Sequence, residues 1–407
     1  MQRTYSRRRF RPRYFRISIV LVGAILISTV AWSYGTALTA PGSSSLGVKT
    51  VEWIRGHGGA SIVRYAENFW YSHNKPPVGG KPPAGAIAKV TKSTTTTIAK
   101  GPAHLPPPKS LVPFVSPSIA GEGVWQPQGR LIGGVAGLYT TTIRPSTVYT
   151  SLVAGVAWMD PNLLSFTLFA GAAEPGHGPW TYMAPFSTTE EQSLVAAFNA
   201  GFRMQDAKGG WYSEGRQVYP LVNGAASFVI YKNGTANVVQ WGRDQTLTSD
   251  VASVRQNLSL IVDNGKVNPA VYSNNFLIWG ATVGNAVLVW RSGVGVTANG
   301  AIIYAAGAGL STANLANILI RAGAVRAMEM DINSTWTNFF YFNPSTNNGL
   351  ALPSNGSRLV YNMLRPPARY FEGTARDFIA AFARPTDANG HVIPQTSSST
   401  TSSVPAG

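Results

Sequence analysis

The chain is predicted to adopt an α+β fold with a mixed, largely antiparallel sheet core and few helices, preceded by one N-terminal transmembrane helix. Short runs rich in β-branched and aromatic residues recur along its 407 residues, and such runs are typical of strands. Asn-Gly pairs separate several of them, which favours hairpins over crossover connections. One uncharged run near the N-terminus approaches the length of a membrane-spanning helix.

The predicted strands are short and closely spaced. They include residues 149–159, 163–170, 226–231, 236–241, 258–263, 286–290, 301–306, 325–331, 339–342 and 377–383. The pairs Asn233-Gly234, Asn264-Gly265 and Asn299-Gly300 lie between neighbouring runs and predict tight hairpin turns.

Two helices are predicted in the same region. One begins after an N-cap at Ser311 and ends at Ala322, because its apolar residues share one face and Gly323 follows it. The other covers residues 189–198, where acidic residues precede an apolar run.

The N-terminus predicts a single-pass membrane protein. Residues 1–16 hold seven arginines and no acid, and form a basic cytoplasmic tail; residues 17–40 are uncharged and form a signal anchor. Arginines stay on the cytoplasmic side, so the rest of the chain is expected outside the cytoplasm, at the cell envelope. The alternative is a cleaved signal peptide, with Leu38-Thr39-Ala40 as cleavage site and a secreted product.

Four further segments follow the anchor. They are a juxtamembrane segment (41–73), a Pro/Lys/Thr-rich linker (74–117), one domain (118–385) and a Ser/Thr-rich tail (386–407) predicted to be disordered. The linker is expected to be a semi-extended tether whose lysines can contact anionic wall polymers.

Charge and cysteine content exclude several classes of protein. The formal net charge is +16, but the excess of bases lies in residues 1–16 and in the linker, and the domain is nearly neutral. The charge is therefore not that of a nucleic-acid-binding surface. The absence of cysteine excludes disulfides, thiolate metal sites and a thiol nucleophile.

Candidate site residues cluster where predicted elements end beside glycine. Three such spots are Asn199-Ala200-Gly201-Phe202-Arg203, Arg291-Ser292-Gly293-Val294-Gly295 and Glu329-Met330-Asp331-Ile332-Asn333-Ser334. Glycines there let a ligand approach the backbone. Asn199 could hold a sugar hydroxyl or cap a turn.

Glu329 and Asp331 are two of the four carboxylates between residues 264 and 385. Two positions apart on a strand, they would project together at a spacing suited to glycoside hydrolysis. In the alternative, Glu329 pairs with a buried arginine such as Arg291 and only Asp331 meets substrate. An unpaired Arg291 could instead clamp a phosphate or carboxylate.

The three spots together resemble the phosphodiester glycosidase family. Its Asn-Gly-Gly-Phe-Phe-like motif appears as Asn199-Ala200-Gly201-Phe202, its Arg-Thr-x-x-Gly-like motif as Arg291-Ser292-Gly293-Val294-Gly295, and its Asp-Gly-Gly-Gly-Ser motif as Asp331-Ile332-Asn333-Ser334. Order and spacing agree over about residues 190–335. Ile332 and Asn333 stand where the family has glycines, which narrows the approach to the backbone.

The resemblance implies a hydrolase of a sugar phosphodiester or a related cell-envelope glycan. It implies Asp331 as nucleophile or base, and Glu329 as acid or as the residue that orients Arg291. Arg291 would hold the phosphate, while Asn199, Asn333 and Ser334 contact the sugar. No cofactor is indicated, although oxygen ligands from this group leave a hard cation such as Ca²⁺ open. The alternative function is a non-catalytic module that binds glycan or wall polymer on a tether.

Overall fold

The computed structural model describes residues 12–39, 46–59, 62–63, 76–88, 102–273, 276–280 and 287–393. The chain forms two compact units, Met1–Arg64 and Tyr65–Gly407, called here the N-terminal unit and the C-terminal unit. The predicted basic tail up to residue 11 and the C-terminal tail from residue 394 lie outside the described residues.

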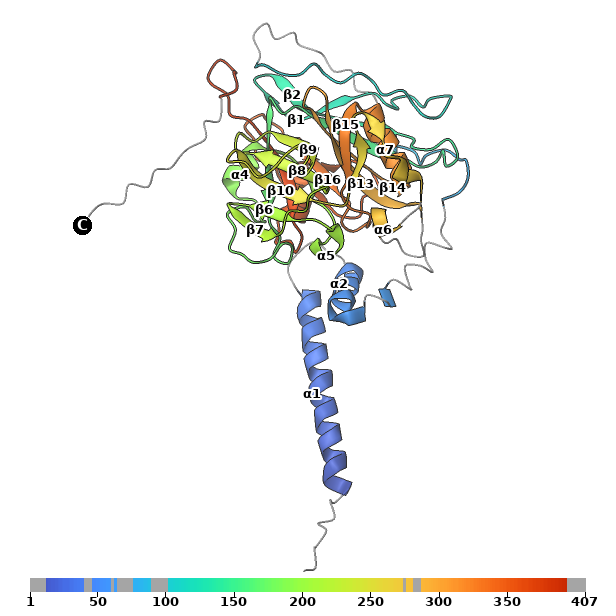
Figure 1. Cartoon of the computed structure of the whole chain (residues 1–407), viewed down its shortest axis with the longest axis vertical. Helices are drawn as coiled ribbons and strands as arrows, with labels where there is room; N and C mark the ends of the chain where they lie inside the picture. Colours follow the sequence, from blue (N-terminus) through green and yellow to red (C-terminus); the bar gives the residue numbers. More distant parts are fainter. Residues whose placement is uncertain are drawn as a thin grey trace, which may run out of the picture. The chain divides into compact units, whose positions relative to one another are not determined.

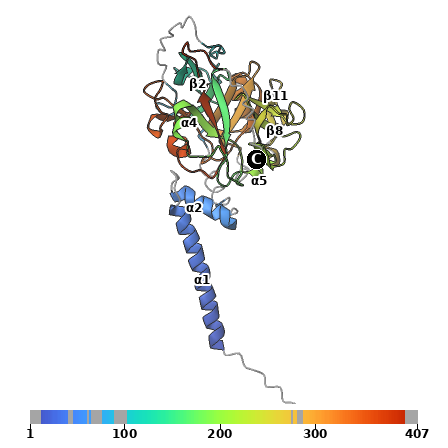
Figure 2. The ribbon, with the colours of Figure 1, turned by 90° about the vertical axis from the view of Figure 1, so that its left-hand side faces the viewer.

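The N-terminal unit is a pair of helices (Figures 1 and 2). Helix α1 (Pro12–Thr39) contains the apolar stretch Ile17–Thr39, of mean hydropathy 2.0, which has the length and composition to cross a membrane. Helix α2 (Leu46–Ile54) folds back onto its C-terminal end and leads into the short π-helix η1 (Arg55–Gly59). Trp53 Nε1 donates to Ser33 Oγ at 3.0 Å.

The C-terminal unit is built from three antiparallel sheets (Figure 1). The first has the order β1 (Gln126–Ile132), β2 (Val135–Ile143), β3 (Ala154–Met159), β14 (Ile302–Leu310), β13 (Val289–Thr297), β15 (Ala324–Glu329), β11 (Leu260–Asp263) and β12 (Lys266–Val267). The second has the order β7 (Arg216–Tyr219), β6 (Trp211–Ser213), β10 (Val251–Gln256), β8 (Ala226–Tyr231) and β9 (Ala236–Gln240). The third has the order β17 (Gly356–Arg358), β16 (Phe339–Phe342), β5 (Leu194–Asn199), β18 (Phe378–Ala383) and β4 (Leu164–Phe169).

The helices of this unit are few and short, as predicted. They are α4 (Thr188–Ser193), α5 (Met204–Ala207), α6 (Phe276–Trp279), α7 (Thr312–Arg321) and the 3₁₀ turns η2 (Pro269–Tyr272), η4 (Pro353–Asn355) and η5 (Pro367–Tyr370). Helix α7 has the predicted cap, because Ser311 Oγ accepts from Asn314 N at 3.0 Å. Predicted Asn-Gly turns connect β8 to β9, β11 to β12 and β13 to β14.

Strand β14 shows how the first sheet is buried on both faces. Ile302 and Tyr304 face a core shared with the other sheets, whereas Ile303 and Ala305 face the helix side. There Leu315 and the other apolar residues of α7 cover the sheet. This alternation places each residue of the central strands on a fixed face.

The predicted helix over residues 189–198 was wrong in its second half. Helix α4 ends at Ser193, and residues 194–199 form β5 between β16 and β18. All six residues of β5 are buried. A strand buried on both faces reads as an unbroken apolar run, which periodicity alone cannot distinguish from a buried helix. Asn199 therefore ends a central strand.

The described part of the predicted linker contacts the domain and is not a free tether. Ala86 and Ile87 pack against Val153. Further along, residues 102–125, called here the strap, are held by two carboxylates: Asp160 Oδ2 accepts from Leu105 N at 2.7 Å, and Glu122 pairs with Arg144 at 2.8 Å. Residues 89–101 lie outside the described residues.

Candidate functional site

Asn199 sits at the centre of a buried hydrogen-bond network. Its Oδ1 accepts from Tyr304 Oη at 2.6 Å and from Asn338 N at 3.2 Å, and its Nδ2 donates to Ser292 Oγ at 3.1 Å. The side chain is 5% exposed. Both ends of the amide therefore bind the protein, and Asn199 fixes the ends of several strands against one another.

Ser292 joins Asn199 to Asp331. Ser292 N donates to Asp331 O at 2.8 Å, and Asp331 N donates to Ser292 Oγ at 3.1 Å. This bonding continues β13 beside the chain that leaves β15. All three predicted spots thus meet at Ser292, a residue that the sequence places in a motif without giving it a role.

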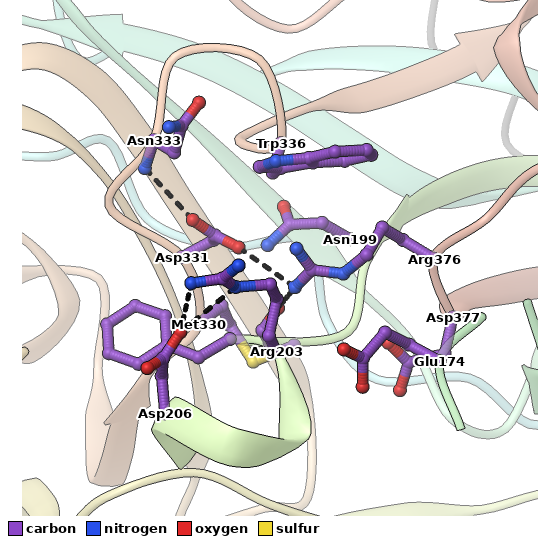
Figure 3. Close-up of polar contacts among 12 residues, drawn as sticks. Glu174, Asn199, Arg203, Asp206, Met330, Asp331, Asn333, Trp336, Arg376 and Asp377 are labelled. Carbon is purple, nitrogen blue, oxygen red and sulfur yellow. Dashed lines mark hydrogen bonds and ion pairs between the residues drawn. The ribbon is translucent and has the colours of Figure 1, made fainter. Parts of the chain in front are cut away.

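The Asp331 carboxylate lies between a backbone amide and an arginine (Figure 3). Its Oδ1 accepts from Asn333 N at 2.9 Å, and its Oδ2 is 3.4 Å from Arg376 Nη2. Asp331 is 4% exposed. Burial raises the pKa of Asp331, while Arg376 and the amide of Asn333 act in the opposite direction.

Arg291 and Glu329 form a separate buried ion pair through Arg291 Nη1 and Glu329 Oε1. Arg291 Nε also donates to Leu310 O at 2.9 Å. Burial raises the pKa of Glu329, and the positive charge of Arg291 opposes that rise. The pair corresponds to the alternative in which Glu329 binds a buried arginine and Asp331 alone faces substrate.

Glu329 and Asp331, the predicted acid pair, contact different guanidiniums, Glu329 that of Arg291 and Asp331 that of Arg376. Strand β15 ends at Glu329. The negative charge of Asp331 also raises the pKa of Glu329, in addition to the larger effect of burial.

Asn333 and Ser334 lie in a half-buried turn after Asp331. Asn333 O accepts from Thr337 N at 2.8 Å, and its Oδ1 accepts from Thr335 N at 2.9 Å. The turn shapes the backbone around Asp331. Ile332, where the resembling family has glycine, packs partly buried beside Phe202.

The glycine of the first motif packs closely against a buried arginine. A Cβ atom on Gly201 would lie 3.3 Å from Arg255 Cζ. Gly201 O accepts from Arg376 Nη2 at 2.7 Å. The loop therefore packs against the buried guanidinium of Arg255 and accepts a hydrogen bond from Arg376, which also contacts Asp331.

Arg376 is a residue that the sequence does not predict for the site. It precedes β18 and is next to Asp377, whose Oδ2 accepts from Arg255 Nε at 2.7 Å. The signal available in the sequence is an Arg-Asp pair at the start of a strand. Its partner Asp331 is 45 residues away in the chain, and nothing in the local pattern links the two.

Within the described ranges, no group of three or more His, Cys, Asp and Glu side chains is arranged to hold a metal ion. Glu329, one of the candidates, is engaged with Arg291.

Residues 192–364 match the sequence model of the phosphodiester glycosidase family. Residues 192–364 are called here the glycosidase domain after this match. The match spans Asn199, Arg291, Glu329, Asp331 and Asn333, and ends before Arg376. A comparison with curated proteins finds no match.

Solved structures similar to this chain are distant in sequence. The catalytic domain of zebrafish N-acetylglucosamine-1-phosphodiester alpha-N-acetylglucosaminidase, auto-inhibited by its pro-peptide, is 14% identical with a TM-score of 0.40, and the alignment covers 64% of this chain and 88% of that one. A hypothetical protein from Synechocystis is 14% identical with a TM-score of 0.34, and 64% of each chain is covered.

Proposed function

We propose that the glycosidase domain hydrolyses a sugar-1-phosphodiester, with Asp331 as the residue that acts at the glycosidic carbon. The observation that carries this proposal is the Asp331 carboxylate itself. It is fixed by Asn333 N, faces Arg376 across 3.4 Å, and lies in the part of the chain that matches the family.

A phosphate leaving group explains why one carboxylate can suffice. Glycosidases that expel an alcohol use a second carboxyl group as general acid. A phosphate monoester, whose second pKa is about 6, leaves with little need of a proton. Glu329, bound to Arg291, is then a positioning residue, and the Arg291–Glu329 pair links the neighbouring strands β13 and β15 just before the turn that presents Asp331.

The proposed location is the outside of the cell membrane, with α1 as anchor. Two observations support it: the apolar stretch Ile17–Thr39 and the seven arginines that precede it. The substrate is then a glycan or sugar phosphodiester of the cell envelope.

The test uses the full chain in detergent with a sugar-1-phosphodiester, and the free sugar released is measured. Wild type is expected to release sugar, and Asp331→Asn is expected to abolish release while the protein stays folded. Asp387→Asn, an exposed carboxyl outside the site, is the matched control and should retain activity. Release of sugar by Asp331→Asn at the wild-type rate would show that Asp331 has no such role.

The second candidate function is a non-catalytic glycan-binding module. Its support is that Asn199, Arg291 and Asp331 are each at most 5% exposed and bind protein partners. It predicts that wall material sediments with the full chain and that no sugar is released.

A further inference from the structure

Helix α2 binds polar groups at the C-terminal end of α1 (Figure 2). Lys49 Nζ donates to Leu38 O at 3.0 Å, and Trp53 Nε1 donates to Ser33 Oγ at 3.0 Å. As α2 proceeds, its contacts therefore move back along α1, from residue 38 to residue 33. The end of α1 (32–39), together with α2 and η1, is called here the α1–α2 hairpin.

Aromatic rings gather around these hydrogen bonds. The ring centroids of Tyr34 and Trp53 are 5.0 Å apart, and those of Trp53 and His57 are 4.5 Å apart in a stacked arrangement. His57 Nε2 lies 3.1 Å from Ser33 Oγ. Trp32, the neighbour of Ser33 on α1, is 80% exposed. Tryptophan and tyrosine are enriched at membrane–water interfaces, because each ring combines an apolar body with a polar tip.

The length of α1 places the hairpin at the edge of a bilayer. The apolar stretch Ile17–Thr39 has 23 residues, which is about 35 Å at a rise of about 1.5 Å per residue. The hydrocarbon core of a bilayer is about 30 Å thick. Counted from Ile17, its outer boundary falls near Thr36. The contacts of α2 with residues 33–38 thus lie on both sides of that boundary.

The composition of the hairpin and the residues after it suits a charged membrane surface. Residues 46–64 contain three bases and one acid, a net charge of +2 with histidine neutral. Leu46, at the start of α2, and Ile62, after η1, are 66% and 68% exposed. Exposed apolar side chains beside an excess of bases are typical of segments that lie in the interface of membranes with anionic lipids.

We propose that α2 and η1 lie in the headgroup layer of the membrane and bind its anionic phospholipids, with Trp53 and His57 deeper than Leu46. The partner is a lipid surface because the hairpin includes the end of the helix that enters the bilayer, and its contacts span the boundary of the hydrocarbon. The inference rests on the proposed location, with α1 as an uncleaved anchor. It does not depend on sugar hydrolysis.

The test measures how deep single residues lie in a bilayer. The chain contains no cysteine, so one introduced cysteine can carry a spin label on the full chain in nanodiscs of phosphatidylcholine and phosphatidylglycerol. Power saturation with oxygen and with a water-soluble nickel chelate reports the depth of the label. Gly56→Cys suits this purpose, because a Cβ atom there meets no other atom within 4 Å.

The contacts predict an order of depth for four labels. Ile25→Cys, 63% exposed on α1, should lie in hydrocarbon, and Leu247→Cys, 46% exposed in the C-terminal unit, should lie in water. The label on Gly56→Cys should lie about 5–10 Å below the headgroup surface. The label on Leu46→Cys should be shallower than that on Gly56→Cys, because Leu46 is at the opposite end of α2.

Further variants test what holds the hairpin at this depth. Trp53→Ala removes the ring and the bond to Ser33, and should shift the nickel accessibility of the Gly56 label toward that of the Leu247 label. Trp53→Phe keeps a ring and should retain part of the depth. Tyr272→Ala is the matched control, because Tyr272 is a 61% exposed aromatic residue of the C-terminal unit. Replacing phosphatidylglycerol with phosphatidylcholine should also make the Gly56 label shallower.

Two results would overturn the proposal: a Gly56 label as accessible to nickel as the Leu247 label, or a Gly56 label shielded from both oxygen and nickel, which would show that protein covers it. Equal depth with and without phosphatidylglycerol would overturn the preference for anionic lipid. An Ile25 label in water would contradict the anchor, and with it the hairpin. Sugar release by the same nanodiscs should be unchanged in Trp53→Ala, so a failure of the proposed hydrolysis is observed separately.

Discussion

The stability of variants can show whether Arg291 and Glu329 have a structural or a catalytic role. Both are buried and paired, so Glu329→Ala leaves an uncompensated guanidinium and should cost about 3–5 kcal/mol of unfolding free energy. The double variant Arg291→Met/Glu329→Leu removes both charges and should recover most of that loss. Denaturant unfolding followed by tryptophan fluorescence measures both. If Glu329→Ala is as stable as wild type but inactive, Glu329 acts in the chemistry instead.

Asp331 should make the folded protein less stable as pH rises. Burial raises its pKa above the ordinary 3.8, so the folded state holds the proton more tightly than the unfolded state. The stabilisation is present below the ordinary pKa and is lost as pH increases through the raised value. Asparagine has no carboxyl group to ionise, so Asp331→Asn should have a higher thermal midpoint than wild type near pH 7. The difference should shrink toward pH 4.

Asp387 provides the control of opposite sign. The amide of His391 lowers the pKa of Asp387, so its contribution is present at neutral pH and is lost as pH falls through the lowered value. Asp387→Asn should therefore lower the midpoint slightly near pH 7. Parallel pH profiles for both variants would contradict the burial effect at Asp331.

The sequence located part of this site and missed the rest for a physical reason. Asn199 and Asp331 stand out because each is polar, ends an apolar run and lies near glycine or a turn. Arg376 has no such local signal: it contacts Trp336, which is 40 positions away, and a cation–π contact imposes no periodicity on the sequence. Only the third sheet, which places β16 and β18 on either side of β5, brings their loops together.

The secondary-structure elements predicted best were those whose sequence pattern fits only one type of element. Strand β8 (Ala226–Tyr231), strand β16 (Phe339–Phe342) and the capped helix α7 agree with prediction within a residue or two. Strand β5 was mistaken for helix because both of its faces are buried. The strand predicted over residues 286–290 was placed too early: β13 covers Val289–Thr297, where Gly293 and Gly295 pack against neighbouring strands that leave no room for a Cβ.

The strap should be released when its buried ion pair is broken. Glu122 is 5% exposed and receives both the side chain and the amide of Arg144, which also binds Pro117 O at 2.7 Å. Glu122→Ala leaves Arg144 unpaired, at a cost of about 3–5 kcal/mol. Trypsin should then cleave after the exposed Lys109 at least about tenfold faster than in wild type, provided that cleavage follows local opening.

The control for the strap is a surface ion pair. Asp206 pairs with Arg203 at 2.9 Å, and both side chains are largely exposed. Asp206→Ala should change stability by less than about 1 kcal/mol and leave cleavage at Lys109 unchanged. Equal cleavage in all three proteins would show that the strap is not held by Glu122.

The net charge of the whole chain lies mostly outside the part that contains the candidate site. Most of the net charge of +16 lies before residue 118, whereas basic and acidic residues after it form internal pairs such as Arg144–Glu122 and Arg255–Asp377.

Helix α1 is either an uncleaved membrane anchor or part of a cleaved signal peptide, and the two alternatives predict different products. An uncleaved anchor keeps residues 1–40 on the mature protein, which should stay in the membrane pellet after alkaline carbonate washing. Leu26→Arg places a charge in the middle of the apolar stretch, at a cost of about 2.5–3.5 kcal/mol for insertion, and should shift protein out of the pellet. Thr39→Arg, at the end of the stretch, should leave the protein in the pellet.

A mature chain that begins at residue 41 and is found in the soluble fraction would instead establish α1 as a signal peptide. Helix α2 would then lose the helix against which it packs.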